Sequence, residues 1–261
     1  MRSLLFEIAD AVQKAVQSTD GAFEDVDVAM GADGTPTTRI DKIAEDAVLK
    51  VLAKHGNPLN VLSEECDFQD NGREMTLVLD PIDGTVNATS GFPFYAVSLA
   101  VGSRDLDGVA FALVRNLATG ETFYAGKGMG AFRNGERIKV RGYDPEKGIF
   151  LVYLGNHADK SACRIAGVPR RTRSFGSAAL ETCMVASGSA DMYAIIADQR
   201  IRGLRVVDIA AASLILREAG GELYEPNGKK FTMAYDIKDR KNVVAVGDRK
   251  ALEAAGMGAA I

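Results

Sequence analysis

Two segments near the start of the chain carry apolar residues at the spacing of one helical face. Apolar positions that recur every three or four residues predict amphipathic α-helices over residues 1–16 and 38–54. Thr38 followed by Asp41 fits a capping box, which by itself would explain the aspartate at the start of the second helix. Residues 20–37 are polar and glycine-rich without a sustained period, so a mobile loop is predicted between the helices.

Short apolar runs bounded by turn residues predict strands in the rest of the first half. These runs cover residues 61–62, 77–79, 95–102, 108–117, 121–126 and 130–140. The pair Asn134-Gly135 predicts a tight hairpin inside the last run. With the two helices, the strands predict an α+β half over residues 1–145, built on an antiparallel sheet.

Strands and helices alternate in the second half, residues 146–261. Strands are predicted at residues 149–154, 172–175, 192–196 and 242–246, and helices at residues 177–186, from Asp208 to Gly220, and from Arg249 onward. The charged stretch 141–148, with Gly142 and Pro145, is the predicted seam between the halves. Alternation of this kind predicts an α/β half with a mixed sheet.

Composition and charge exclude several classes of protein. With 47% hydrophobic residues the chain can bury a sizeable core, and a net charge of −4 argues against binding nucleic acid by neutralising its backbone. No apolar run is long enough to span a bilayer. The three cysteines, Cys66, Cys163 and Cys183, lack metal-binding spacing, which favours reduced thiols in a cytoplasmic protein and disfavours zinc.

The most informative stretch for chemistry is Leu77-Val78-Leu79-Asp80-Pro81-Ile82-Asp83-Gly84-Thr85. It predicts a buried strand that breaks at Pro81 and ends in two carboxylates, a glycine and a hydroxyl. Two acids this close repel each other and are costly to bury, so a hard divalent cation is the favoured partner. The amides after Asp83 are predicted to open a short helix that could receive an anion. The alternative is a turn with Asp83 as a helix cap.

The same stretch resembles the first signature of the inositol monophosphatase family of metal-dependent phosphatases. The second signature of that family is matched by Asp208-Ile209-Ala210-Ala211-Ala212 followed by Glu218-Ala219-Gly220-Gly221, and a family Glu-Glu pair by Glu64-Glu65. The resemblance implies a layered αβαβα sandwich of the sugar phosphatase type. It also implies a phosphoric monoester hydrolase whose substrate is a small phosphate ester.

The resemblance further implies how the metals are held. One metal would bind Glu64, Asp80 and the carbonyl of Ile82, and a second would bind Asp80, Asp83 and Asp208. Two or three Mg²⁺ ions are expected, with Mn²⁺ possible. A metal-activated water, oriented by Thr85 and Glu64, would attack phosphorus, and Asp41 would reach the metals through water.

Two of these acids have open alternatives. Asp208 could be only a helix cap. Glu64 and Glu65 are adjacent on a predicted strand, so only one can face the metals, and the resemblance selects Glu64. No basic residue is expected to pair with the acid cluster.

Substrate choice is less defined by the sequence. Ile201 and Val207 replace the acid and the tryptophan of animal inositol monophosphatases, so the chain is more similar to the archaeal-type branch that acts on both inositol 1-phosphate and fructose 1,6-bisphosphate. The predicted substrate-binding residues are Gly84, Thr85, Tyr153, Arg173, Gly176, Ser177, Arg200 and Arg205. The arginines would hold a second phosphate.

Two other functions stay open at this point. One is a nucleotide 3′-phosphatase, of the 3′(2′),5′-bisphosphate nucleotidase type, because the metal signatures are shared across the superfamily. The other is a regulatory or RNA-processing binding partner with secondary catalysis. The family resemblance also implies a homodimer.

Overall fold

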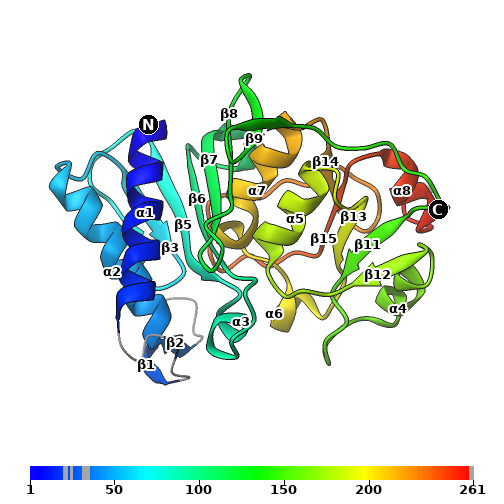
Figure 1. Ribbon diagram of the computed structural model, residues 1–261, viewed down its shortest axis with the longest axis horizontal. Coiled ribbons are helices and arrows are strands. Elements are labelled where there is room, and N and C mark those ends of the chain that lie inside the picture. The colour runs from blue at the N-terminus through cyan, green and yellow to red at the C-terminus, as the bar shows by residue number, and fades with distance from the viewer. Residues whose placement is uncertain (20–22, 24–25, 31–35, 259–261) are drawn as a thin grey trace.

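The computed structural model describes residues 1–19, 23, 26–30 and 36–258. Its helices and sheets alternate in layers, from the helix pair α1 and α2 through a large sheet, the helices α5 and α7 and a small sheet to the outer helices α4 and α8 (Figure 1). The predicted αβαβα sandwich is therefore confirmed. No helix in the described part of the chain is long and apolar enough to cross a membrane.

The first layer consists of α1 (Arg2–Ser18) and α2 (Arg39–Lys54), close to the predicted bounds. Both helices pack their apolar faces onto the large sheet, where Leu5, Ile8 and Val48 are fully buried. The predicted capping box at Thr38 and Asp41 is present. The amphipathic pattern thus located both helices, because only one face of each is covered.

The large sheet has eight strands in the order β10-β9-β8-β7-β6-β5-β3-β4. Its strands are β3 (Asn60–Ser63), β4 (Asp67–Gln69), β5 (Thr76–Asp83), β6 (Ala96–Gly102), β7 (Val109–Asn116), β8 (Thr122–Gly126), β9 (Gly130–Arg133) and β10 (Glu136–Ile138). All neighbours are antiparallel except β3 and β5, which are parallel. The hairpin at Asn134-Gly135 lies between β9 and β10, as predicted.

Strand β5 differs from its prediction in one respect. It does not break at Pro81 but continues to Asp83, and its register with β6 shifts between Asp80 and Asp83. Proline has no N–H to give to the ladder, so the irregularity lets the strand pass Pro81 while Asp80 and Asp83 both stay buried. Gly84 and the short helix α3 (Thr85–Thr89) follow directly.

The inner layers come from the second half of the chain. Helices α5 (Ala178–Ala186) and α7 (Val206–Glu218) lie between the two sheets, and α7 is buried at every position from Val206 to Leu216. The small sheet has the order β12-β11-β13-β15-β14 and is mixed, as predicted. Its strands are β11 (Ile149–Val152), β12 (Arg171–Arg173), β13 (Met192–Ile195), β14 (Glu222–Tyr224) and β15 (Val243–Val246), covered by α4 (Lys160–Ala166) and α8 (Arg249–Ala254).

Several short elements were not predicted. They are β1 (Asp27–Met30), β2 (Pro36–Thr38), β4, α4, α6 (Gln199–Arg202), the 3-10 turn η1 (Leu106–Gly108) and β14. Most span only a few residues, too few to show a period. Strands β1 and β2 pair within the predicted loop, and the rest of that loop prediction, at residues 20–22, 24–25 and 31–35, lies outside the described residues.

The strands of the two sheets separate on either side of residue 145, since β10 ends at Ile138 and β11 begins at Ile149. The hydrophobic core does not separate there. One cluster of buried side chains joins Val78 and Val114 of the large sheet to Ile209 of α7 and Tyr193 of the small sheet. The division into halves at residues 145 and 146 therefore stays a prediction.

Candidate active site

Three carboxylates converge where the large sheet meets α7. Glu64, Asp80 and Asp208 each offer an oxygen atom, and these atoms all lie within 4.8 Å of one another. Glu64 follows β3, Asp80 lies on β5, and Asp208 lies in the first turn of α7. Helix α7 packs across β5, β6 and β7, which brings an aspartate from far along the chain to the carboxyl ends of the neighbouring parallel strands β3 and β5.

Arg205 also belongs to this cluster, and the expectation of no basic partner is wrong. Its Nη1 lies 2.8 Å from Glu64 Oε1 and its Nη2 lies 3.0 Å from Asp208 Oδ1. Arg205 is the N-cap residue of α7, so Asp208 is the third helical residue and not the cap itself. One guanidinium cannot neutralise three carboxylates, so the cluster keeps an excess of negative charge.

Asp80 carries much of that excess. Its side chain is buried, and it accepts a hydrogen bond from the amide of Ile82 at 3.0 Å but has no ion pair with a described residue. Burial, reinforced by the charges of Glu64, Asp83 and Asp208, raises the pKa of Asp80 well above its usual range. A buried, under-compensated set of carboxylate oxygens fits a hard divalent cation.

Asp83 lies in the same cavity but caps another helix. Its carboxylate accepts hydrogen bonds from the Ser177 hydroxyl and from the amides of Ala178 at 3.2 Å and Ala179 at 2.8 Å, the first residues of α5. Burial raises the pKa of Asp83 to about 6, although these hydrogen bonds act to lower it. Asp83 is not one of the three acids whose oxygen atoms lie within 4.8 Å, so the structure joins it to the site through α5.

Asp41 caps α2 and also contacts Thr85 at the site. One oxygen accepts from the backbone amide of Thr38 at 3.0 Å, which caps α2, and the other accepts from the Thr85 hydroxyl at 3.1 Å. The Thr85 hydroxyl also lies 3.1 Å from the carbonyl oxygen of Ile82. Burial raises the pKa of Asp41. A continuous polar path therefore runs from the start of α2 to the end of β5.

The side chains of Glu64 and Glu65 point to different partners, as expected, but strand geometry is not the reason. Both lie in the turn after β3 and not on a strand, so strand alternation does not set their directions. Glu64 pairs with Arg205, whereas Glu65 accepts a hydrogen bond from the Thr37 hydroxyl beside the start of α2. Only Glu64 is among the three clustered acids.

A cavity of about 250 Å³ opens over the clustered acids. Gly84 lies at its base with φ of 95°, and a Cβ at this position would lie 3.2 Å from the carbonyl oxygens of Gly176 and Phe94. A side chain at residue 84 would therefore be strained and would crowd the loop before α5. The lining residues are Glu64, Asp80, Ile82, Asp83, Gly84, Thr85, Tyr153, Ser174, Gly176, Ser177, Ala178, Glu181, Tyr193, Ile195, Ile201, Arg202, Gly203, Leu204, Arg205, Asp208 and Arg240.

Of the predicted substrate-binding residues, most line this cavity, but Arg173 and Arg200 do not. Arg173 is exposed and donates to the carbonyl of Thr172, and Arg200 is exposed and pairs with Asp198. Arg202, which the sequence places on the same arginine-rich segment as Arg200 and Arg205, does line the cavity, and so does Arg240, which was missed. Arg240 had no sequence signal, because an isolated bridge between Leu204 and Lys241 brings it to the site.

Glu181 is a second residue that the sequence did not single out. Its two carboxylate oxygens accept hydrogen bonds from the amides of Phe175 at 3.0 Å and Gly176 at 3.2 Å. Burial raises the pKa of Glu181 to about 7. Its helical position in the apolar α5 gave no hint that it holds the loop in front of Ser177.

The layered fold and a buried acid cluster facing a small cavity define a class of protein, the metal-dependent phosphoric monoester hydrolases. The chain belongs to the inositol monophosphatase family, whose model matches residues 1–256. The family resemblance in the sequence is thereby confirmed.

Individual relatives agree with this assignment. The chain is 37% identical over 265 residues to a fructose-1,6-bisphosphatase/inositol-1-monophosphatase of Methanothermobacter thermautotrophicus, covering 95% of this chain and 92% of that protein. It is 33% identical over 268 residues to a bifunctional NADP phosphatase/NAD kinase of Methanococcus maripaludis, covering 94% of this chain and 46% of that protein. A crystal structure of an inositol monophosphatase-fructose 1,6-bisphosphatase superposes with a TM-score of 0.85 at 30% identity, covering 97% of each chain.

Proposed function

We propose that the protein is a Mg²⁺-dependent phosphomonoesterase that hydrolyses fructose 1,6-bisphosphate and inositol 1-phosphate. The observation that carries the proposal is the convergence of Glu64, Asp80 and Asp208 at the cavity, where Arg205 pairs with Glu64 and Asp208. The names of relatives that span nearly the whole chain support the two substrates.

The metal would be held by Glu64, Asp80 and Asp208, together with Asp83 and the carbonyl oxygen of Ile82. All of these are oxygen ligands, which favours Mg²⁺ over softer metals. When bound, Mg²⁺ supplies Lewis-acid stabilisation of phosphate oxygens and lowers the pKa of water.

The chain's own residues orient the reacting groups and handle the proton. Thr85 Oγ1 donates to Asp41 Oδ1 or to the Ile82 carbonyl, which leaves its lone pairs directed to accept a hydrogen bond from the attacking water. Glu64 lines the cavity and can receive the water proton at a carboxylate oxygen. Asp41 helps to fix the direction of the Thr85 hydroxyl, since its Oδ1 lies 3.1 Å from Thr85 Oγ1.

Other residues that line the cavity can hold the rest of the substrate. Arg202 and Arg240 bring positive charge to the lining, and the side chain of Tyr153 offers a phenolic hydroxyl. Guanidinium groups suit a second phosphate because they can donate to two of its oxygens at once. This arrangement favours a sugar bisphosphate over a monophosphate with only hydroxyl groups at its far end.

A nucleotide phosphatase is the second candidate. The relative named NADP phosphatase/NAD kinase matches 94% of this chain, so a phosphorylated nucleotide is a realistic substrate for the same catalytic groups. The two candidates differ only in the part of the substrate that would contact Arg202 and Arg240, a second phosphate group or a nucleotide.

A phosphate-release assay tests both candidates. Fructose 1,6-bisphosphate, inositol 1-phosphate, NADP and adenosine 3′,5′-bisphosphate would be compared at equal concentration with Mg²⁺. We expect the first two to be hydrolysed fastest. A clear preference for NADP or the adenosine bisphosphate would move the assignment to a nucleotide phosphatase, and no turnover of any would favour a binding role.

Metal dependence is tested in the same assay. Excess chelator should abolish phosphate release and added Mg²⁺ should restore it, because the carboxylates have no other route to bind and activate water. Full turnover in excess chelator would contradict the mechanism. The homodimer implied by the family resemblance belongs to the same proposal, and sedimentation equilibrium would measure it.

A further inference from the structure

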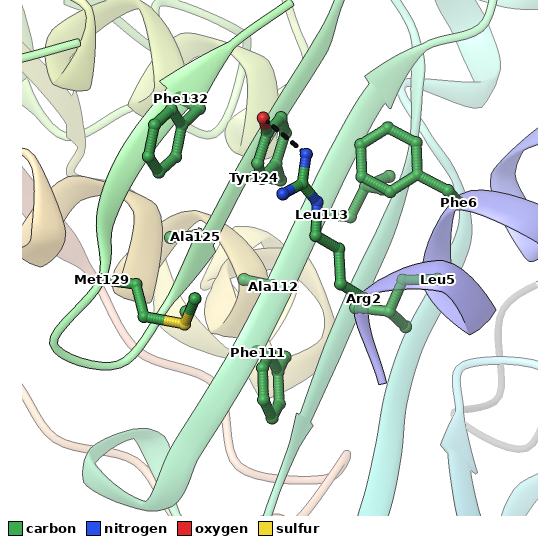
Figure 2. A pocket seen from close by; sticks show the side chains of 11 residues that line it. Arg2, Leu5, Phe6, Phe111, Ala112, Leu113, Tyr124, Ala125, Met129 and Phe132 are labelled. Carbon is green, nitrogen blue, oxygen red and sulfur yellow. Dashed lines mark hydrogen bonds between the residues drawn. The ribbon is translucent and has the colours of Figure 1, made fainter. Parts of the chain in front are cut away.

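A second cavity lies on the large sheet, away from the carboxylate cluster. It has a volume of about 100 Å³ and lies between the start of α1 and the face of β7, β8 and β9 that α1 leaves uncovered (Figure 2). The lining residues are Arg2, Leu5, Phe6, Phe111, Ala112, Leu113, Tyr124, Ala125, Gly126, Met129 and Phe132. None of them lines the active-site cavity.

Four aromatic side chains, those of Phe6, Phe111, Tyr124 and Phe132, line this second cavity. Tyr124 and Phe132 stack with ring centroids 5.2 Å apart and an interplanar angle of 11°, and Phe6 meets Tyr124 edge to face at 5.2 Å. In Figure 2, Phe111 and Met129 complete the opposite side. An enclosed apolar cavity of about 150 Å³ is known to accept benzene, whereas this cavity is smaller but open to the surface, so an aromatic ring can enter it in part and leave its substituent outside.

Arg2 places a positive charge at the edge of the rings. Its guanidinium carbon lies 4.5 Å from the Tyr124 centroid and 5.6 Å from that of Phe6, and its Nη2 donates to the Tyr124 hydroxyl at 2.9 Å (Figure 2). Within the part of the chain that the structure describes, Arg2 forms no ion pair and no acidic side chain lines the cavity. The first turn of α1 also contains no acidic residue.

The polar groups at this edge are arranged to receive an anion. The Tyr124 hydroxyl accepts from Arg2, so its own hydrogen stays available, and the ring is only 8% exposed. The guanidinium keeps further N–H donors, and the positive end of the α1 dipole lies beside it. Charge complementarity therefore selects a negatively charged group attached to an apolar ring.

We propose that this pocket is a binding site for a small arylcarboxylate, with its ring in the cavity beside Phe111, Met129 and Phe132 and its carboxylate at Arg2. The proposal does not depend on the proposed phosphatase function, because the two cavities share no lining residue.

Gly126 provides a way to close the pocket without touching Arg2. It pairs with Phe111 on the neighbouring strand, and a Cβ at Gly126 would lie 2.6 Å from Met129 Sδ, the mobile part of an exposed side chain. Met129 can move away, so Gly126→Val keeps the strand and fills the cavity. Arg2→Gln removes the charge while keeping a donor for Tyr124.

The test is titration of the protein with phenylacetate, followed by amide chemical shifts in NMR spectra. Phenylacetamide serves as the neutral equivalent, and acetate as the ligand without a ring. We expect phenylacetate to bind with a dissociation constant on the order of 1 mM, the scale for about ten non-hydrogen atoms, and to shift amides of α1, β8 and β9. Acetate should shift none of them.

The variants separate the parts of the site. Arg2→Gln should weaken phenylacetate about tenfold, the scale of one charge-assisted contact, while the affinity for phenylacetamide stays the same. Gly126→Val should abolish binding of both. Arg164→Gln, an exposed arginine on α4, removes the same charge elsewhere and should change nothing.

Three results would overturn the proposal. One is equal affinity of the native protein for phenylacetate and phenylacetamide, which would show that the charge of Arg2 does not contribute to binding. Another is a set of shifts scattered over the surface. The third is no binding by phenylacetate, and if the Gly126→Val variant also has an altered mass in sedimentation, the surface is assigned to a second copy of the chain. A cooperative thermal unfolding transition like that of the native protein shows that Gly126→Val is folded.

Discussion

Helices α2 and α7 begin in the same way, yet only one of them delivers an acid to the carboxylate cluster. Each has an aspartate as its third residue, Asp41 or Asp208, whose side chain caps the backbone amide three residues earlier. Both aspartates are buried. The residues at the caps differ, since Thr38 opens α2 and Arg205 opens α7.

That difference decides what surrounds each aspartate. Asp41 receives hydrogen bonds from neutral groups, Thr38 and Thr85, and reaches the site only through the latter. Asp208 shares the guanidinium of Arg205 with Glu64 and lies next to Asp80. A capping pattern in a sequence therefore identifies the start of a helix. The charged side chains packed against that start, which only the structure shows, identify whether it belongs to the active site.

The largest expected effect comes from replacing each of the two aspartates, one at a time, by asparagine. Asparagine still caps a helix, so both variants should fold. Asp208→Asn removes a metal ligand and should lower kcat on the order of a thousandfold, which corresponds to several kcal/mol of lost charge stabilisation. Asp41→Asn acts through Thr85 and should cost about tenfold. Steady-state phosphate release measures both, and equal losses would place Asp41 directly on the metal.

The two adjacent glutamates extend the comparison, because Glu64 joins the α7 side and Glu65 joins the α2 side. Glu64→Gln removes a clustered charge and weakens proton uptake from water, so kcat should fall on the order of a hundredfold. Glu65→Gln should be much milder. A reversal of the two effects in the same assay would show that Glu65 faces the metal during turnover.

Regular elements and ligand candidates were predictable from the sequence for a physical reason. Helices α1 and α2 each expose one face, so their helical period is visible in the sequence. The acids of β5 and α7 belong to sequence motifs that are specific to the family. Arg205 was predicted as a substrate contact because a sequence does not show that its side chain turns back onto Glu64. Arg240 could not be found, because a tertiary bridge positions it.

Arg205 and Arg173 test which arginine serves the shared site. Arg205 contacts two of the clustered acids, so Arg205→Ala should lower kcat/KM about tenfold or more for fructose 1,6-bisphosphate and inositol 1-phosphate alike. Arg173 is exposed and does not line the cavity, so only the phosphate of fructose 1,6-bisphosphate that lies farther from the acids could contact it. Arg173→Ala should therefore leave kcat/KM for inositol 1-phosphate unchanged. If Arg205→Ala instead raised KM for fructose 1,6-bisphosphate alone, Arg205 would be a contact of the second phosphate, as the sequence predicted.

The last prediction concerns stability and not catalysis, at a third helix start, that of α5, where Glu181 accepts hydrogen bonds from the amides of Phe175 and Gly176. Burial raises its pKa in the folded protein to about 7, from 4.5 when unfolded. Between these values the folded state binds the extra proton, so stability should fall as pH rises from about 4.5 to 7 and then level off. The linkage amounts to about 3 kcal/mol, or several degrees in Tm. Glu181→Gln should remove this part of the pH dependence, measured by thermal unfolding of metal-free protein at several pH values. Parallel pH profiles for Glu181→Gln and the native protein would show that Glu181 is ionised throughout and that its two amide contacts already stabilise the charge.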